Sequence, residues 1–383
     1  MIYFDNAATT RVDPKVASVV QEAMLDVFGN PSSPHTLGLA AERLVRQARD
    51  ALAAAFGCRA DEVYFTSGGT EGDNLAIRGV LEARSRKGKH IVASAIEHAA
   101  VLETLKHLAD VGLCEYTLIS PDGKGYVAPE DLVAAMRSDT VLVTVMAVNN
   151  EVGTVQPIQE MVRQVKATDN AIYFHTDAVQ ALGKIPCRVT DLGVDLLTAS
   201  GHKLAGPKGV GSLYCRRGIR LSSQTTGGGQ EEGLRSGTEN VPGIAGFGLA
   251  VELAMNQMTE RVRNWREMQE CLLRLLEEIP DSHVHGEPLS NAPHIINVGF
   301  PGVKGEVLVH ALANEGLFVS TGSACSSKRA PQSHVLAAMQ VPRDVAEGSI
   351  RISFGSANTT KEVERAGELI AKAVAELRRF QRQ

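Results

Sequence analysis

Two side chains with the potential for chemistry, Lys203 and Asp177, each follow a short apolar segment. Residues 194–199 (VDLLTA) have the pattern of a buried strand, and a turn rich in glycine and proline then carries Lys203. Asp177 ends a second apolar segment, 171–177. Ligands of open α/β sheets bind at the carboxyl ends of the strands, so both side chains are expected at one site.

The pair matches the needs of one cofactor. A partly desolvated lysine is more often neutral and can form a Schiff base, and a carboxylate can pair with a pyridinium nitrogen. Pyridoxal phosphate requires both groups. Lys208 is a rival for the Schiff base, but it lies beside Gly209 at the entry to the next predicted strand and is expected to point elsewhere.

A glycine-rich turn provides a candidate anion site. Residues 62–66 are predicted as a strand, residues 67–74 (SGGTEGDN) as a turn, and a helix is expected from about Leu75. Free amides at a helix N-terminus face an anion, and glycine lets the backbone approach it. The alternative is a plain connector, and a Walker loop is excluded because the Gly-Lys-Ser/Thr ending is absent. His98 follows the predicted strand 90–95 and is expected at the same edge.

Two residues near the C-terminus add reactive groups. Cys325 lies in a segment of small, loop-forming residues, and the neighbouring Lys328 and Arg329 favour its thiolate. An ordinary surface cysteine is the alternative. Arg351 points away from the apolar face of its predicted strand, and a side chain in that position usually faces water. An arginine fork can also bind a substrate carboxylate.

The elements that must position these groups follow a regular order. Strands alternate with helices over residues 60–215, which predicts a mostly parallel, doubly wound sheet. A long helical segment, 244–279, has the length of a link between two domains. The remaining predicted elements indicate a smaller α+β domain: strands 295–300 and 350–354 and helices 305–314 and 361–379.

Composition excludes several classes of function. The chain has 383 residues, a net charge of -5 and no long basic stripe, which argues against direct nucleic-acid binding. No apolar run reaches the roughly 18 residues of a membrane span, and no secretory signal is present, so the expected location is the cytoplasm. The six cysteines are scattered without a Cys-x-x-Cys pair, so neither a disulfide framework nor a metal site is expected.

Eight short motifs occur along the chain: 5–10 (DNAATT), 29–33 (GNPSS), 66–71 (TSGGTE), 97–98 (EH), 175–180 (HTDAVQ), 201–203 (GHK), 235–238 (RSGT) and 322–325 (GSAC). With them the chain resembles the NifS/IscS-type cysteine desulfurases, pyridoxal phosphate enzymes of the class V aminotransferase family, over essentially its whole length. The resemblance implies fold type I, aspartate aminotransferase-like, with a seven-stranded sheet. It also implies a large cofactor domain of residues 15–255. Residues 1–14 and 256–383 would form a small domain carrying a cysteine loop at about 320–333.

The resemblance also implies roles around the cofactor. Lys203 would hold pyridoxal 5'-phosphate covalently and move protons, and Asp177 would pair with the pyridinium nitrogen. Gln180 would bond the ring hydroxyl, and His98 would stack on the ring and assist proton transfer. The phosphate would be held by a further group of residues, of which the last reaches in from the partner subunit of a homodimer: Gly69, Thr70, Ser200, His202 and Thr238.

The substrate roles are implied in the same way. The candidate substrate contacts are Arg351, Asn30 and Asn149. Asn149 would also contact the cofactor. Cys325 would take the sulfur of L-cysteine as a persulfide, leaving L-alanine, and pass it to an iron-sulfur scaffold or a tRNA-thiolation acceptor protein. The alternatives are a selenocysteine lyase, another class V enzyme, or a non-catalytic sulfur-assembly scaffold.

Overall fold

The structure is a computed structural model that describes residues 1–322 and 333–381. Within these residues the largest sheet has seven strands in the order β2-β8-β7-β6-β5-β3-β4. Every neighbouring pair is parallel except those that involve β8, which runs against β2 and β7. The predicted mostly parallel sheet is therefore confirmed. Its strands are β2 (Val63–Thr66), β3 (His90–Ser94), β4 (Glu115–Ile119), β5 (Thr140–Thr144), β6 (Tyr173–Asp177), β7 (Leu196–Ser200) and β8 (Gly211–Cys215).

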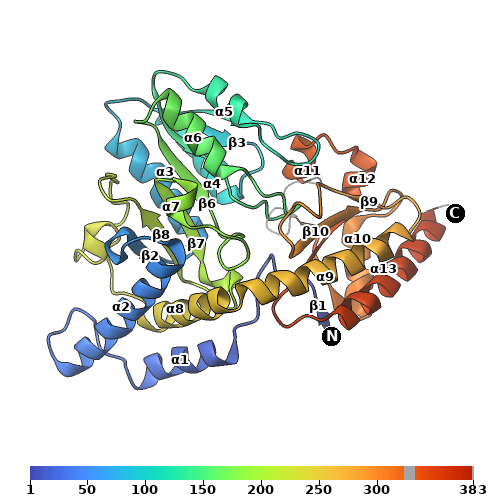
Figure 1. Ribbon diagram of the computed structural model, residues 1–383, viewed down its shortest axis with the longest axis horizontal. Coiled ribbons are helices and arrows are strands. Elements are labelled where there is room, and N and C mark those ends of the chain that lie inside the picture. The colour runs from blue at the N-terminus through green and yellow to red at the C-terminus, as the bar shows by residue number, and fades with distance from the viewer. Residues whose placement is uncertain (323–332, 382–383) are drawn as a thin grey trace.

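Helices cover both faces of this sheet (Figure 1). Alternate residues of β3 point to opposite faces of the sheet. Ile91 and Ala93 belong to one apolar cluster, and Val92 belongs to another. The first cluster includes residues of α3 (Gly69–Ala83) and α4 (Ala99–Asp110). The second includes residues of α2 (Thr36–Phe56), α5 (Pro129–Ala135), α6 (Ile158–Thr168), α7 (Val189–Leu192) and α8 (Val241–Asn256), and α1 (Pro14–Leu25) packs on α8.

A separate apolar core lies in the part of the molecule at the right of Figure 1. It is built on an antiparallel sheet, β12-β10-β9, and on the parallel pair β1-β11. Its strands are β1 (Ile2–Tyr3), β9 (His283–Val284), β10 (Ile295–Gly299), β11 (Leu317–Phe318) and β12 (Ser349–Ser353). The helices on this side are α9 (Met258–Glu277), α10 (Gly305–Asn314), α11 (His334–Ala338), α12 (Arg343–Glu347) and α13 (Thr360–Gln381).

The predicted long helix is two helices with a break at Gln257. Phe247 of α8 belongs to a core of the large sheet, and Leu272 of α9 belongs to the core of the small sheets. The chain therefore passes from one core to the other at this break, as α9 shows in Figure 1. The predicted domain limits themselves stay a prediction.

Two further differences concern helix α3 and strand β4. Helix α3 begins at Gly69, inside the glycine-rich turn, rather than at Leu75. Strand β4, at the sheet edge, was not predicted because its side chains are largely exposed and lack an apolar pattern. In the described part of the chain, no helix is long and apolar enough to cross a bilayer.

Candidate active site

The sheet brings the predicted chemical groups to one edge. Strand β6 ends at Asp177, and β7 ends at Ser200, directly before the 3-10 helix η2 (Gly201–Lys203). Strands β2 and β7 both pair with β8, and Thr66 and Ser200 each lie opposite Gly211. The glycine-rich turn after β2 therefore lies beside the turn that carries Lys203.

Lys203 contacts a segment that sequence reasoning gave no role. Its Nζ donates to the carbonyl oxygens of Ala7 and Ala8 at 2.5 and 2.7 Å. The Gln180 amide donates to the same Ala7 oxygen at 2.9 Å. The N-terminal segment thus joins two of the predicted cofactor residues, and no local signal in the sequence marks contacts of this separation.

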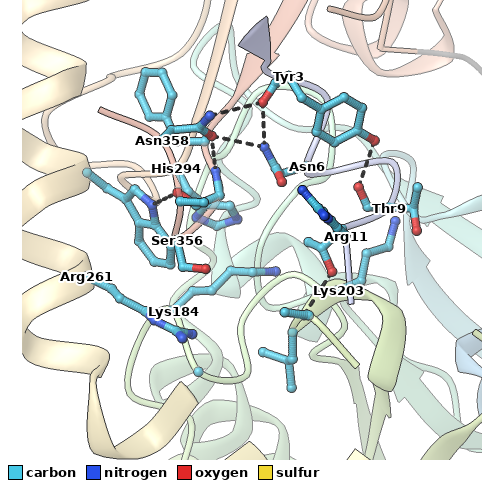
Figure 2. A pocket seen from close by; sticks show the side chains of 18 of the residues that line it. Tyr3, Asn6, Thr9, Arg11, Lys184, Lys203, Arg261, His294, Ser356 and Asn358 are labelled. Atoms are coloured by element: carbon cyan, nitrogen blue, oxygen red, sulfur yellow. Dashed lines mark hydrogen bonds between the residues drawn. The ribbon is translucent and has the colours of Figure 1, made fainter. Parts of the chain in front are cut away.

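A cavity of about 480 Å³ also reaches Lys203, and Figure 2 shows its lining. Lys184, Arg261 and His294 lie around it. Lys184 is buried and donates to the Gln180 carboxamide oxygen at 3.3 Å. Burial lowers the pKa of Lys184 to about 7, so this amine is partly neutral at physiological pH.

Asp177 is buried at the carboxyl end of β6. Its Oδ1 accepts a hydrogen bond from the Val179 amide at 2.8 Å. Burial raises the pKa of Asp177, while His98 and Lys203 act in the opposite direction. A carboxyl group in such a place gains from a nearby cation, which is what the predicted pyridinium partner would provide.

His98 caps the N-terminus of α4. Its Nδ1 accepts from the Ala100 amide at 3.1 Å, so the ring proton of the neutral form lies on Nε2. Burial lowers the pKa of His98, and the charge on Lys203 lowers it further, against Asp177, which raises it. The imidazole is therefore held in one tautomer, with Nε2 left to exchange a proton.

Two more buried carboxyl groups, Asp73 and Glu97, lie near enough to Asp177 to influence one another electrostatically. Burial raises the pKa of Glu97 to about 8, and burial together with Asp177 raises that of Asp73. Asp73 Oδ1 lies 3.6 Å from Nε2 of His175, but burial lowers the pKa of His175 to about 3, so the contact is not an ion pair. Asp177 is the one of these three whose charge both Lys203 and His98 favour.

The glycine-rich turn forms a cavity of about 370 Å³ with donors on its walls. The first amides of α3, at Gly69 and Thr70, lie beside the Ser200 hydroxyl, which is buried and has no hydrogen-bond partner within residues 1–322 and 333–381. His202 contacts the Thr9 hydroxyl at 3.2 Å, and burial lowers its pKa to about 4. Unpaired donors at a helix N-terminus fit a phosphate group. The residues predicted for the phosphate are thus brought together, except Thr238.

The side chain of Lys208 does not point away from the site, although the sequence predicted that it would. It is exposed and lines both cavities rather than pointing away from them. The turn between β7 and β8 is short, so both of its lysines stay at the ligand edge. An amine on the wall of an anion cavity favours phosphate binding by charge alone.

Arg351 is buried, so of the two interpretations of its position, contact with water does not apply. Its Nη2 donates to Asp5 Oδ1 at 2.8 Å, and its Nη1 donates to the Asn150 carbonyl at the same distance. The side chain lies between the small sheet and the N-terminal segment, where the sequence pattern of β12 alone could not place a partner. Asn149 is also fully buried, and its side chain bonds the backbone of Ile96, Glu151 and Val152. These bonds order the turn after β5, and the predicted contacts of Asn149 with cofactor and substrate stay predictions.

Two predicted residues lie apart from the rest in the single chain. Asn30 is exposed, and its side chain accepts from the Ser32 amide at 2.9 Å. Thr238 is exposed in the glycine-rich segment 227–240. The role predicted for Thr238 requires a second subunit, so exposure in one chain agrees with it.

Cys325 lies outside the described residues. The five described cysteines are free thiols: Cys58, Cys114, Cys187, Cys215 and Cys271. Burial raises the pKa of Cys58, Cys187 and Cys215 to about 12 and that of Cys114 to about 11. These four thiols are protonated at neutral pH and are weak nucleophiles.

Comparisons with known proteins agree with this arrangement. The family model "Aminotransferase class-V" matches residues 2–366. The chain is 44% identical to a protein of Methanosarcina thermophila named cysteine desulfurase IscS, over 98% of this chain and 93% of that relative. It is also 44% identical to the protein of the same name from Dictyoglomus turgidum, over 98% and 95%. A solved structure described as a NifS-like protein superposes with a TM-score of 0.92 at 38% identity, covering 98% of this chain and 99% of that one.

Proposed function

Because the chain belongs to the class V aminotransferase family, we propose that it is a cysteine desulfurase that converts L-cysteine to L-alanine and keeps the sulfur as a persulfide on Cys325. The observation that supports this most directly is the convergence of Lys203 and Asp177 beside an anion cavity, in a chain with full-length relatives named cysteine desulfurase.

The family depends on pyridoxal phosphate, and the residues present fit it. The amides of Gly69 and Thr70, with Ser200 and His202, would hold its phosphate. Asp177 would pair with its ring nitrogen, Gln180 would bond its hydroxyl, and Lys203 would bind its aldehyde carbon. The unpaired Ser200 hydroxyl supports this assignment, because a buried polar atom without a partner is costly unless a ligand satisfies it. When bound, the cofactor provides an electron sink for the substrate carbons.

The chain's own groups would then handle binding and protons. Arg351 would bind the substrate carboxylate through its guanidinium fork. Lys203 would move protons at the substrate carbons, and His98 Nε2 would exchange a proton with the bound substrate. Asn149 would keep the turn that carries Asn150 in place for Arg351.

The sulfur step needs a thiolate. Cys325 would attack the substrate sulfur and form a sulfur–sulfur bond while the carbon–sulfur bond breaks. The electron pair of the broken bond stays with carbon, and a proton completes the methyl group of alanine. The sum of the reaction is L-cysteine plus thiol giving L-alanine plus persulfide, so no external oxidant is needed.

The assembly and partners belong to the same proposal. We expect a cytoplasmic homodimer in which Thr238 of each subunit reaches the phosphate of the other, with Asn30 as a further substrate contact. The persulfide would pass to an acceptor protein of iron-sulfur assembly or of tRNA thiolation. Sedimentation of the intact protein tests the homodimer, and a Thr238→Ala variant with weakened cofactor retention would support the shared site.

Turnover separates this function from its alternatives. The cofactor-loaded protein is incubated with L-cysteine or L-selenocysteine, and alanine and released sulfide or selenide are measured. A desulfurase loses cysteine turnover in Cys325→Ala, keeps its cofactor absorbance and is unaffected by Cys58→Ser. A selenocysteine lyase keeps turnover of selenocysteine without Cys325. A protein that cannot take up the cofactor is a scaffold, and the proposal then fails.

A further inference from the structure

The guanidinium of Arg351 already holds a carboxylate. Asp5 Oδ1 lies 2.8 Å from Arg351 Nη2, and the two side chains are 21% and 3% exposed, respectively. Arg351 Nη1 donates to the Asn150 carbonyl, while its Nε is buried and has no hydrogen-bond partner among the described residues. The fork is therefore partly occupied, and at least its Nε–H is unused.

The same short segment connects this ion pair to the active-site lysine. Asp5 bonds Arg351, and the carbonyls of Ala7 and Ala8 bond Lys203. The Cα atoms of Asp5 and Ala8 lie at most about 11 Å apart, so Arg351 and Lys203 contact the same short segment. Figure 2 shows Asn6 and Thr9 of this segment in the cavity that Lys203 lines.

We propose that Asp5 is an internal competitor for Arg351, whose carboxylate pairs with the guanidinium until the carboxylate of the amino-acid substrate replaces it. This inference rests on the proposed function, because it takes an amino acid to be the ligand next to Lys203. The two carboxylates have the same charge and the same geometry toward a guanidinium fork, so they compete for one binding partner.

The surroundings of Asp5 allow the exchange. Its backbone is held independently of the carboxylate, since its carbonyl accepts from the Tyr3 hydroxyl at 3.1 Å and from the Ala8 amide at 3.0 Å. The Ser353 hydroxyl fixes the next turn by accepting from the Ala7 amide at 2.8 Å. The side chain can therefore turn toward water, to which it is already partly exposed, without moving the chain.

The physical reason for a resident carboxylate is the burial of Arg351. An unpaired guanidinium at this depth carries a large desolvation cost, so an internal anion stabilises the substrate-free protein. The same anion must be displaced by every substrate molecule. Asp5 is thus a positioning residue that sets substrate affinity, not a catalytic one.

Two substitutions separate competition from a purely structural role. Asp5→Asn keeps the shape and an oxygen acceptor for Arg351 but removes the charge, and Asp5→Ala removes both. Asp13→Asn is the matched control, because Asp13 lies in the same N-terminal region and its carboxylate caps α1, accepting from the Lys15 amide at 2.8 Å, instead of binding Arg351. L-alanine is titrated into each cofactor-loaded protein by cofactor absorbance, and acetate is titrated by calorimetry.

Competition predicts that both Asp5 variants bind L-alanine and acetate about tenfold more tightly than the wild type, because no charge-assisted bond has to be broken first. KM for L-cysteine falls while kcat changes little, and Asp13→Asn behaves as the wild type. A structural role predicts an unchanged Asp5→Asn and a weakened Asp5→Ala, and either result overturns the proposal. Acetate binding does not depend on turnover, so tighter acetate binding in a protein inactive on cysteine would refute the proposed function alone.

Discussion

The amine of Lys203 donates a hydrogen bond to the carbonyl oxygen of Ala7, across 196 positions of the chain. Because Gln180 donates to the same oxygen, the N-terminal segment fixes two side chains of the large sheet relative to each other. The first ten residues therefore form part of the candidate active site, although they begin in the smaller core.

The lysine that binds the cofactor can be identified chemically. Borohydride reduction of the loaded protein followed by peptide mapping is expected to label Lys203. Lys203→Ala should lose the label and more than about 10²-fold in turnover, because the residue that moves protons is gone. Lys208→Ala is the control and should keep the label. A label on Lys208 in the wild type would contradict the assignment.

Asp177 and Asp73 should respond differently to the same change. Asp177→Asn removes the charge that would face the pyridinium nitrogen, and a loss of about 10²–10³-fold in turnover is expected for a preorganised electrostatic group. Asp73→Asn should cost much less, because burial and Asp177 raise the pKa of Asp73 and favour its neutral form, and an amide has nearly the same shape. Turnover and cofactor absorbance of both variants test this, and equal losses would argue against a special role for Asp177.

Glu97 makes the stability of the protein depend on pH. Burial raises its folded pKa to about 8 from the usual 4.5, so the folded state keeps a proton that the unfolded state releases. Folding therefore loses up to about tenfold in equilibrium constant per pH unit as pH rises between these values. Glu97→Gln should remove this loss, and its advantage over the wild type should grow from about pH 4.5 and level off above about pH 8.

Urea unfolding of both proteins at several pH values measures this advantage. The carboxamide introduced by Glu97→Gln can still accept hydrogen bonds from Ser94 and from the Met146 amide, the two partners that Glu97 has now. A constant difference between the two proteins across the range would show that Glu97 is ionised in the folded state.

Glu231 anchors the glycine-rich segment that carries Thr238. Its carboxylate accepts from Arg49 at 2.8 and 2.9 Å and from the Phe65 amide at 2.9 Å. Glu231→Ala leaves the largely buried Arg49 without its carboxylate partner and should cost about 3 kcal/mol. Glu232→Ala, at an exposed position, should stay within about 0.5 kcal/mol. Chemical denaturation compares the two, and a small effect of Glu231→Ala would show that the segment is held by other contacts.

The sequence predicted what depends on local pattern. Apolar runs predicted β6 and β7, and therefore placed Asp177 and Lys203 at their carboxyl ends. This works because a buried strand consists of consecutive apolar residues, which a short window of sequence shows. The start of α3 was placed too late, since glycine has low helix propensity and only the packing of the turn fixes Gly69 as the first residue.

Long-range pairing could not be predicted in this way. The alternation of side chains along β12 placed Arg351 on the face opposite the apolar residues, where a side chain usually contacts water. Its partner Asp5 lies 346 positions away in the sequence. The same holds for the carbonyls that contact Lys203. Such contacts depend on the path of the N-terminal segment between the two cores. A short stretch of sequence does not show this path.

The persulfide itself tests the central claim most directly. The cofactor-loaded protein is given limiting L-cysteine without reductant, free thiols are alkylated, and the peptides are analysed by mass spectrometry alongside an assay of alanine. The account predicts one additional sulfur atom on the Cys325 peptide for each alanine formed, with the peptides of Cys58 and Cys271 unchanged. Alanine formed with the extra sulfur on another cysteine, or no alanine at all, would contradict it.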